Sequence, residues 1–226
     1  MSLYNEEKGV FMKFYQKTLI VTGGSVDYEW AKEWLKDREY DYVIAADSGL
    51  LHAYRLGLKV DYILGDYDSL EDGIIEKYEN TETVTYPAEK DYTDTHLAII
   101  TAIKQGADLI DIIGATGSRY DHAMTNIYNM KAALDVDIPC RIYDRHNCIY
   151  LKDCNFTIKK DEQYGDYLSF VPMTENVVLG LEGVKYPLSE YNLKQGLSIC
   201  QSNEITETEA KIYIKNGILV VFETLD

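Results

Sequence analysis

The fold is decided by the stretch LIDIIGATGSRYDH, which runs from Leu109 to His122. Its first five residues are mainly leucine and isoleucine, as in a buried strand, and Gly114 ends the apolar run. The segment that follows, from Asp121 to Leu134, has the pattern of a helix. A strand, a glycine-rich turn and a helix in this order form half of a βαβ unit, so the stretch predicts a parallel sheet.

The same alternation of strand and helix surrounds this stretch. The other expected strands are Lys17–Thr22, Tyr42–Ala46, Tyr62–Leu64, Thr83–Tyr86 and Cys140–Tyr143. The other expected helices are Asp27–Lys36, Leu50–Leu56, Ile74–Tyr78 and Thr93–Lys104. Strands rich in valine and isoleucine that alternate with helices indicate a parallel sheet covered on both faces. In such a sheet, ligands bind beyond the carboxyl ends of the strands.

The pattern changes after about Asp144, where short alternating runs and many turns begin. This predicts a small antiparallel β domain of sandwich or barrel-like type. The expected fold class is therefore α/β, with a parallel-sheet N-terminal domain followed by the small antiparallel domain. We place the first domain at residues 13–144 and the second at residues 145–226.

One turn in the second domain carries a strong signal. Asn216-Gly217 separates two alternating runs, Ala210–Ile214 and Ile218–Phe222. Because Asn-Gly suits the positive φ angles of a tight type I′ turn, the pattern predicts that these two runs form a hairpin.

Composition excludes several classes of function. The 226 residues carry a formal net charge of −16, which repels nucleic acid and anionic membrane surfaces at long range. The sequence has no run of about 20 apolar residues for a membrane helix, and its first residues lack the apolar segment of a signal peptide. Its four cysteines and four histidines show no zinc or redox spacing. We therefore expect a cytoplasmic protein that binds neither nucleic acid nor membrane.

Two acidic motifs follow predicted strands. Gly65-Asp66-Tyr67-Asp68-Ser69 closes the third strand, and a D-x-D there can direct both carboxylates at one Mg²⁺. Lys90-Asp91-Tyr92-Thr93-Asp94 precedes a helix, so Asp94 can reach the same cation. Each motif also has a plainer interpretation. The first can be an exposed turn with two solvated acids, and in the second Asp91 or Thr93 can cap the helix.

Small residues after two other strands suggest a nucleotide site. The segment from Gly114 to His122 joins a strand to a helix, and its backbone amides and helix N-terminus can hold phosphate. Arg119 can form paired hydrogen bonds with phosphate oxygens. Ala45-Ala46-Asp47-Ser48-Gly49 offers another nucleotide contact at a strand end. The alternative is that both segments are ordinary turns with helix caps, Asp121 in the first, and that His122 is structural.

Taken in this order, the motifs resemble the thiamine pyrophosphokinase family over nearly the whole chain. The matching segments are ADSG at 46–49, GDYDS at 65–69, KDYTD at 90–94, GATGSRYDH at 114–122 with Asn126, GLS at 196–198 and SNE at 202–204. The chain departs from the family at Ser118, where glycine is common, and it has no tryptophan in the β domain. The resemblance implies an enzyme that transfers the terminal diphosphate of ATP to the hydroxyl of thiamine, giving thiamine diphosphate and AMP.

The resemblance also implies residue roles and a homodimer. The implied catalytic residues are Asp66, Asp68, Asp91, Asp94 and Arg119, and the implied Mg²⁺ ligands are Asp66, Asp68 and Asp94. The implied ATP contacts are Asp47, Ser48, Gly49, Lys90, Thr93, Thr116, Gly117, Ser118, Asp121, His122 and Asn126. Thiamine is expected beside Ser202 and Asn203, where the β domain of one subunit meets the α/β domain of the other.

Two rival functions stay open at this point. One is a diphosphokinase for another hydroxymethyl heterocycle, such as a pterin. The other is a regulatory module that binds a nucleotide or a metal without turnover. AMP release measured with a panel of alcohols separates the first rival from a thiamine enzyme. Mg²⁺-dependent production of AMP with thiamine, present or absent, separates the second.

Overall fold

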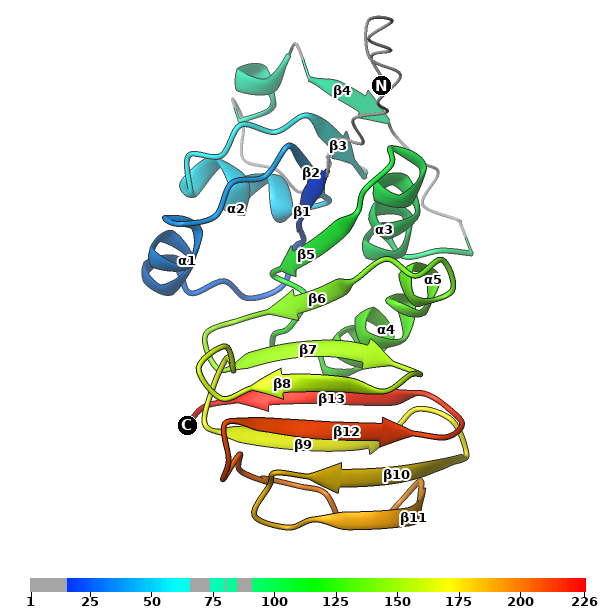
Figure 1. Cartoon of the computed structure of the whole chain (residues 1–226). Helices are drawn as coiled ribbons and strands as arrows, with labels where there is room; N and C mark the ends of the chain where they lie inside the picture. Colours follow the sequence, from blue (N-terminus) through cyan, green and yellow to red (C-terminus); the bar gives the residue numbers. More distant parts are fainter. Residues whose placement is uncertain (1–15, 66–73, 80, 85–90) are drawn as a thin grey trace, which may run out of the picture.

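The computed structural model of the chain describes residues 16–65, 74–79, 81–84 and 91–226. Within these residues, nine strands form one sheet, in the order β4-β3-β2-β1-β5-β6-β7-β13-β9. Their bounds, in the same order, are Glu82–Val84, Tyr62–Leu64, Tyr42–Ala46, Lys17–Val21, Leu109–Ile113, Cys140–Tyr143, Asn147–Lys152, Leu219–Thr224 and Tyr167–Pro172. Figure 1 shows the sheet extending from β4 at the top toward the antiparallel strands below.

The sheet changes from parallel to antiparallel along its width. From β4 to β6, every pair of neighbouring strands is parallel. The pairs β6–β7, β7–β13 and β13–β9 are antiparallel. The predicted order, a parallel α/β part followed by an antiparallel β part, is confirmed. The sheet itself continues across residue 144, and the division into domains 13–144 and 145–226 stays a prediction.

Helices cover both faces of the parallel part, with α1 and α2 on one face and α3, α4 and α5 on the other (Figure 1). Their bounds are Tyr28–Leu35, Gly49–Arg55, Asp94–Lys104, Tyr120–Asn129 and Lys131–Leu134, and a 3₁₀ turn, η2, spans Ile75–Tyr78. No helix among the described residues is both long and apolar enough to cross a membrane.

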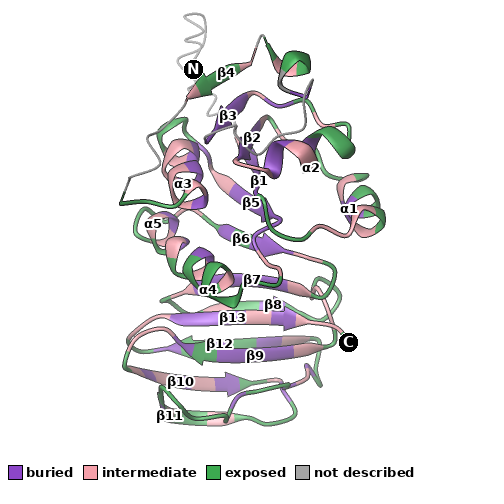
Figure 2. Ribbon diagram, turned by 180° about the vertical axis from the view of Figure 1, so that it is seen from behind, coloured by how far each residue is buried: buried purple, intermediate pink, exposed green. Residues whose placement is uncertain are grey.

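Side chains of the central strands alternate between two cores. Leu19 and Val21 of β1 belong to the core that includes Trp34 of α1. Ile20 points to the opposite core, which includes Ile99 of α3. Figure 2 shows the central strands buried along most of their length. Burying each such side chain contributes about 1.5–3 kcal/mol, which holds the carboxyl ends of these strands in a fixed arrangement.

Side-chain caps set the starts of two helices. Asp27 caps α1 by accepting hydrogen bonds from the amides of Glu29 and Trp30, both at 3.1 Å. Thr93 caps α3 by accepting from the amide of His96, so capping falls on Thr93. The helix expected from Asp121 to Leu134 is instead two helices, α4 and α5, and neither proline nor glycine accounts for the interruption between them.

A second, antiparallel sheet packs against the antiparallel part of the first. Its strand order is β11-β10-β12-β8. The bounds are Leu188–Lys194, Asn176–Glu182, Glu209–Ile214 and Phe156–Lys159. Phe170 and Val221 of the first sheet share one buried cluster with Leu179 and Ile212 of the second. This is the sandwich expected from the alternating pattern.

The predicted hairpin at Asn216-Gly217 is wrong. Its two strands exist, but β12 pairs with β10 and β8, whereas β13 pairs with β7 and β9. Gly217 has a φ of 81° and Asn216 is not among the residues with positive φ, although a type I′ turn needs positive φ at both positions. The Asn216 side chain instead accepts a hydrogen bond from the amide of Val178 at 3.0 Å. The turn therefore carries the chain from one sheet to the other.

Candidate functional site

A cavity of about 800 Å³ lies at the carboxyl ends of β1, β2 and β5. The chain passes from β1 through β2, β3 and β4 on one side of the sheet, and β5 then pairs with the other side of β1. A reversal of this kind is where doubly wound sheets bind ligands. The cavity is lined by residues 22–25 after β1, Ala46 and Asp47 after β2, residues 92–95 at the start of α3, residues 114–119 after β5, and Asp121, His122, Thr125 and Asn126 of α4.

The loops after β1 and β5 touch through their backbones. The amide of Gly24 donates to the carbonyl of Gly114, and the amide of Ser25 donates to the carbonyl of Thr116, both at 2.7 Å. A Cβ atom on Gly24 would lie 2.3 Å from each of these carbonyl oxygens, so only glycine allows this approach. Two segments far apart in sequence thus form one continuous backbone wall.

His52 of α2 supports the first of these loops from behind. Its Nε2 lies 2.8 Å from the carbonyl oxygen of Gly24, and its Nδ1 lies 2.7 Å from the hydroxyl of Tyr28. Because a carbonyl oxygen only accepts, Nε2 carries the proton and Nδ1 accepts from Tyr28. Burial lowers the pKa of His52, which favours this neutral form. Sequence reasoning did not select His52, since a lone histidine has no recognisable spacing.

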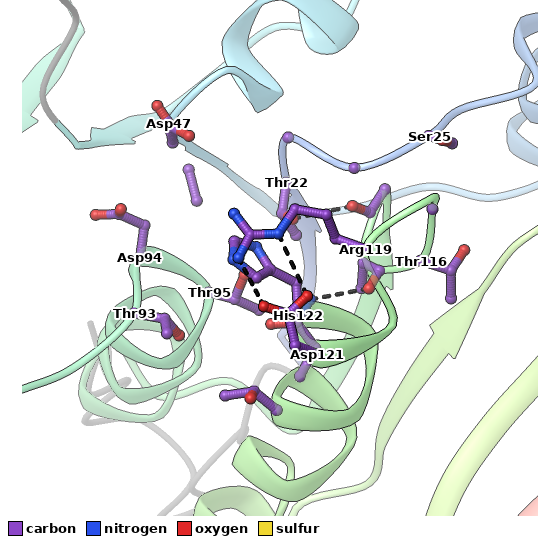
Figure 3. Close-up of a pocket in the computed structure, with 18 of the residues that line it drawn as sticks. Thr22, Ser25, Asp47, Thr93, Asp94, Thr95, Thr116, Arg119, Asp121 and His122 are labelled. Carbon is purple, nitrogen blue, oxygen red and sulfur yellow. Dashed lines mark hydrogen bonds and ion pairs between the residues drawn. The ribbon is translucent and has the colours of Figure 1, made fainter.

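The start of α4 is built around Arg119 and Asp121. Arg119 donates to the Asp121 carboxylate from Nη2 at 2.6 Å and from Nε at 3.3 Å, and both side chains are exposed. This hydrogen-bonded pair lowers the pKa of Asp121 to about 2. Figure 3 shows the pair close to His122, at the head of α4. Arg119 occupies the N-cap position, and arginine has no acceptor with which to cap amides.

Two carboxylates line the opposite wall of the cavity. Asp47 follows β2 with a φ of 51°, and its amide donates to the carbonyl of Leu64 at 2.7 Å. Asp94 opens α3, and Figure 3 places it on the same side of the cavity as Asp47. Within the described ranges, no group of three histidine, cysteine or acidic side chains forms a metal site. Asp66, Asp68 and Lys90 lie outside the described residues.

Other predicted contacts divide into those that line the cavity and those that do not. Thr93, Thr116, Gly117, Ser118, His122 and Asn126 line it. Asn126 also donates from Nδ2 to the carbonyl of Ala115 at 2.8 Å and so supports the loop after β5. Ser48, Gly49 and Asp91 are not among the lining residues. A Cβ atom on Gly49 would lie 2.1 Å from the carbonyl oxygen of Val21, which gives Gly49 a packing role.

The residues expected beside thiamine lie in the antiparallel part of the molecule. Neither Ser202 nor Asn203 lines the cavity of its own chain. Asn203 is buried, and its side chain pairs with backbone groups of Tyr186 and Glu204. Ser202 is exposed and its amide donates to the hydroxyl of Ser169 at 2.9 Å.

Sequence reasoning missed several lining residues. Residues 22–25, Tyr92, Thr95 and Thr125 all border the cavity. The pair Gly23-Gly24 directly after the first strand was the available signal, because it matches the position of the glycine turn after β5. The other missed residues lie within or next to the motifs quoted above, and no sequence pattern marks them individually.

Comparisons with known proteins agree with one another. Residues 34–142 match the family described as "Thiamin pyrophosphokinase, catalytic domain", and residues 153–219 match "Thiamin pyrophosphokinase, vitamin B1 binding domain". The chain is 32% identical over 192 residues to the thiamine pyrophosphokinase of Bacillus subtilis, an alignment that covers 83% of this chain and 89% of the relative.

Solved structures give the same result. A crystal structure of thiamine pyrophosphokinase from Bacillus subtilis superposes with a TM-score of 0.83 at 29% identity, over 93% of this chain and 100% of the other. A thiamin pyrophosphokinase from Geobacillus thermodenitrificans superposes with a TM-score of 0.80 at 28% identity, over 93% and 98%.

Proposed function

The chain belongs to the thiamine pyrophosphokinase family, and from that premise we propose how its cavity performs the reaction. ATP binds at the carboxyl ends of β1, β2 and β5, and its terminal diphosphate passes to the hydroxyl of thiamine. The products are thiamine diphosphate and AMP. The observation that carries the proposal is the cavity of about 800 Å³ at the reversal of the sheet, a size typical of small-molecule sites.

The phosphates of ATP bind to the loop after β5 and to the start of α4. Backbone amides there, together with the positive end of the helix dipole, favour an anion. Support comes from Arg119 at the N-cap, because its side chain has no acceptor and makes no capping hydrogen bond to the first turn of α4. Of the expected ATP contacts, those that line this cavity are Asp47, Thr93, Thr116, Gly117, Ser118, Asp121, His122 and Asn126. Ser48 and Gly49 do not line it, and Lys90 lies outside the described residues.

We assign Mg²⁺ to Asp66, Asp68 and Asp94. Among the described residues, Asp94 and Asp47 bring carboxylate oxygens to one wall of the cavity. Oxygen atoms are the ligands that Mg²⁺ prefers, so these residues fit such an ion. When bound, the ion neutralises charge on the phosphate oxygens.

The chain's own contribution to the transfer is positioning. The hydroxyl of thiamine attacks the β-phosphorus of ATP in line with the departing AMP, and such transfers depend mainly on geometry and charge. Arg119 donates hydrogen bonds to Asp121 from Nε and Nη2. The remaining N–H groups of its guanidinium can donate to a phosphate oxygen. Asp121 thereby orients Arg119, while Asp91 and Lys90 complete the proposed catalytic surroundings.

Thiamine, in this proposal, binds beside Ser202 and Asn203 of a second subunit. The support is that neither residue lines the cavity of its own chain, which is consistent with a second copy supplying them. In this proposal the protein is a cytoplasmic enzyme that forms a homodimer. Residues 13–144 bind ATP and Mg²⁺, and residues 145–226 bind thiamine. Closed two-fold pairs are the commonest oligomers.

The test is AMP production by the full chain from ATP and Mg²⁺, with thiamine or a hydroxymethylpterin as acceptor. We expect AMP with thiamine only. AMP with the pterin but not with thiamine would establish the rival diphosphokinase. ATP binding without AMP from either acceptor would make the protein a regulatory module.

A further inference from the structure

The turn between β6 and β7, residues 144–146, contacts the loop after β5. The hydroxyl of Thr116 donates to Oδ2 of Asp144 at 2.8 Å. In Figure 3 the Thr116 side chain lies on the side of its loop away from Arg119 and Asp121. Because the single hydroxyl proton of Thr116 is used on Asp144, Thr116 offers its backbone, and no side-chain donor, to a phosphate.

The Asp144 carboxylate is itself held in a fixed orientation. Its Oδ1 accepts hydrogen bonds from the amide of His146 and from Nδ2 of Asn147, both at 2.8 Å. The amide of Asp144 donates to the carbonyl of Asn147 at 3.0 Å, which closes the turn. With the bond from Thr116, the carboxylate receives three donors, so its position is defined by the turn and not by solvent.

The next residue in the turn reaches the loop after β1. Arg145 donates from Nη1 to Oδ2 of Asp27 at 2.8 Å, while Oδ1 of Asp27 caps α1. The pair is exposed on the arginine side, so by itself it adds little stability. Its position matters more, because Asp27 lies two residues after Ser25, whose loop touches Gly114 and Thr116.

The turn is anchored to the antiparallel part of the molecule. Tyr164, between β8 and β9, donates from its hydroxyl to the carbonyl of Asp144. The amide of Tyr164 donates to Oε2 of the buried Glu223 of β13 at 2.8 Å, and Tyr150 donates to Oε1 of the same carboxylate at 2.8 Å. A continuous set of hydrogen bonds thus leads from β13 to the wall of the cavity.

We propose that Asp144 is a positioning residue that, through Thr116, holds the loop of residues 114–119 in the conformation that receives the phosphates of ATP. The proposal rests on the proposed function only for the identity of the nucleotide. Asp144 touches no substrate. Its effect is to hold the backbone of this loop in place at the wall of the cavity.

Two variants test the proposal, Asp144→Ala and Thr116→Val. Thr116→Val removes the hydroxyl but keeps the shape of the side chain and leaves the hydrogen bonds inside the turn intact, so it should fold even if Asp144→Ala does not. Loss of a hydrogen bond to a charged group predicts a rise in KM for ATP of about tenfold in each variant. KM for thiamine should not change.

The double variant distinguishes positioning from two separate effects. Because both residues act through one hydrogen bond, Asp144→Ala with Thr116→Val should raise KM for ATP no further than the larger single change. Thr116→Ser, which keeps the hydroxyl, should restore KM to near the wild-type value. Asp153→Ala, which removes an exposed aspartate at the other end of β7, is the matched control and should have no effect.

Calorimetric binding of a non-hydrolysable ATP analogue separates failure of this proposal from failure of the proposed function. If the wild-type protein binds the analogue but does not turn over thiamine, the proposed function fails, while weaker binding by Thr116→Val still supports the positioning role. Binding of the analogue by folded Thr116→Val as tightly as by wild type would overturn the proposal. So would multiplicative losses in the double variant.

Discussion

Gly24→Ala tests whether the contact between the two backbone loops builds the cavity. The new Cβ would lie 2.3 Å from the carbonyl oxygens of Gly114 and Thr116, and both are backbone atoms that cannot rotate away. A carbon and an oxygen in contact need about 3.3 Å, so the loops must separate by about 1 Å. That movement breaks the 2.7 Å hydrogen bonds from Gly24 and Ser25.

The expected cost follows from these two bonds. At about 1 kcal/mol for each neutral hydrogen bond, the variant should lose about 2 kcal/mol of unfolding free energy. A displacement of about 1 Å in a substrate-positioning loop can cost about 10²-fold in kcat/KM. Urea unfolding gives the first quantity and initial rates of AMP formation at varied ATP give the second.

Gly23→Ala is the matched control for this prediction. Its Cβ would lie 2.0 Å from Oγ of Ser48, the free end of a side chain that can turn away. The cost in unfolding free energy should therefore be much smaller. Wild-type stability and kcat/KM in Gly24→Ala would show that the loops part freely, and the argument from their close approach would be refuted.

The remaining predictions concern charge, protonation and assembly. Arg119→Lys keeps the charge but loses the paired hydrogen bonds with Asp121, so kcat/KM should fall while the melting temperature holds; unchanged turnover would make Arg119 a surface residue. Burial lowers the pKa of His52 below 6.5, so the unfolded chain binds this proton at a higher pH than the folded chain does. Urea titrations should show that the unfolding free energy does not change with pH above about pH 7.5 and falls as the pH drops through the pKa of the unfolded chain. His52→Gln should reduce that fall. Asp68→Asn and Asp94→Asn should each cut turnover by about 10²-fold and raise the Mg²⁺ requirement, and the double variant should lose much less than the product; fully multiplicative losses with an unchanged Mg²⁺ requirement would separate the two acids. Light scattering should give about twice the chain mass of 25.9 kDa, and a fully active monomer would contradict the shared site.

Local pattern was sufficient to predict the strands and helices that place the site. Apolar runs ending in Gly114 and in Ala46-Asp47 marked two carboxyl ends of the parallel sheet, and both ends line the cavity. A short continuous apolar run bounded by turn residues is typical of a strand buried on both faces, so these elements follow from sequence alone. The choice of partner does not, because it depends on packing between distant segments. That is why Asn216-Gly217 gave two correct strands and an incorrect pairing.

The direction in which a loop side chain points could also not be predicted from the sequence. Thr116 was expected to contact ATP because of the family resemblance, yet its hydroxyl donates to Asp144. Asp144 itself entered only as the point where the pattern changes. Residues in turns have no period that would indicate what they face, so such contacts emerge only once the fold brings the segments together.

Strand β13 is the last of the described strands in chain order, yet it lies between β7 and β9 in the sheet. During synthesis, β7 must therefore wait with an unpaired edge until β13 has emerged, and unpaired edges invite aggregation. Pairings between segments so distant in the chain also slow folding. Since β7 continues directly from the parallel strands, the cavity wall reaches its final support only when this late strand is inserted.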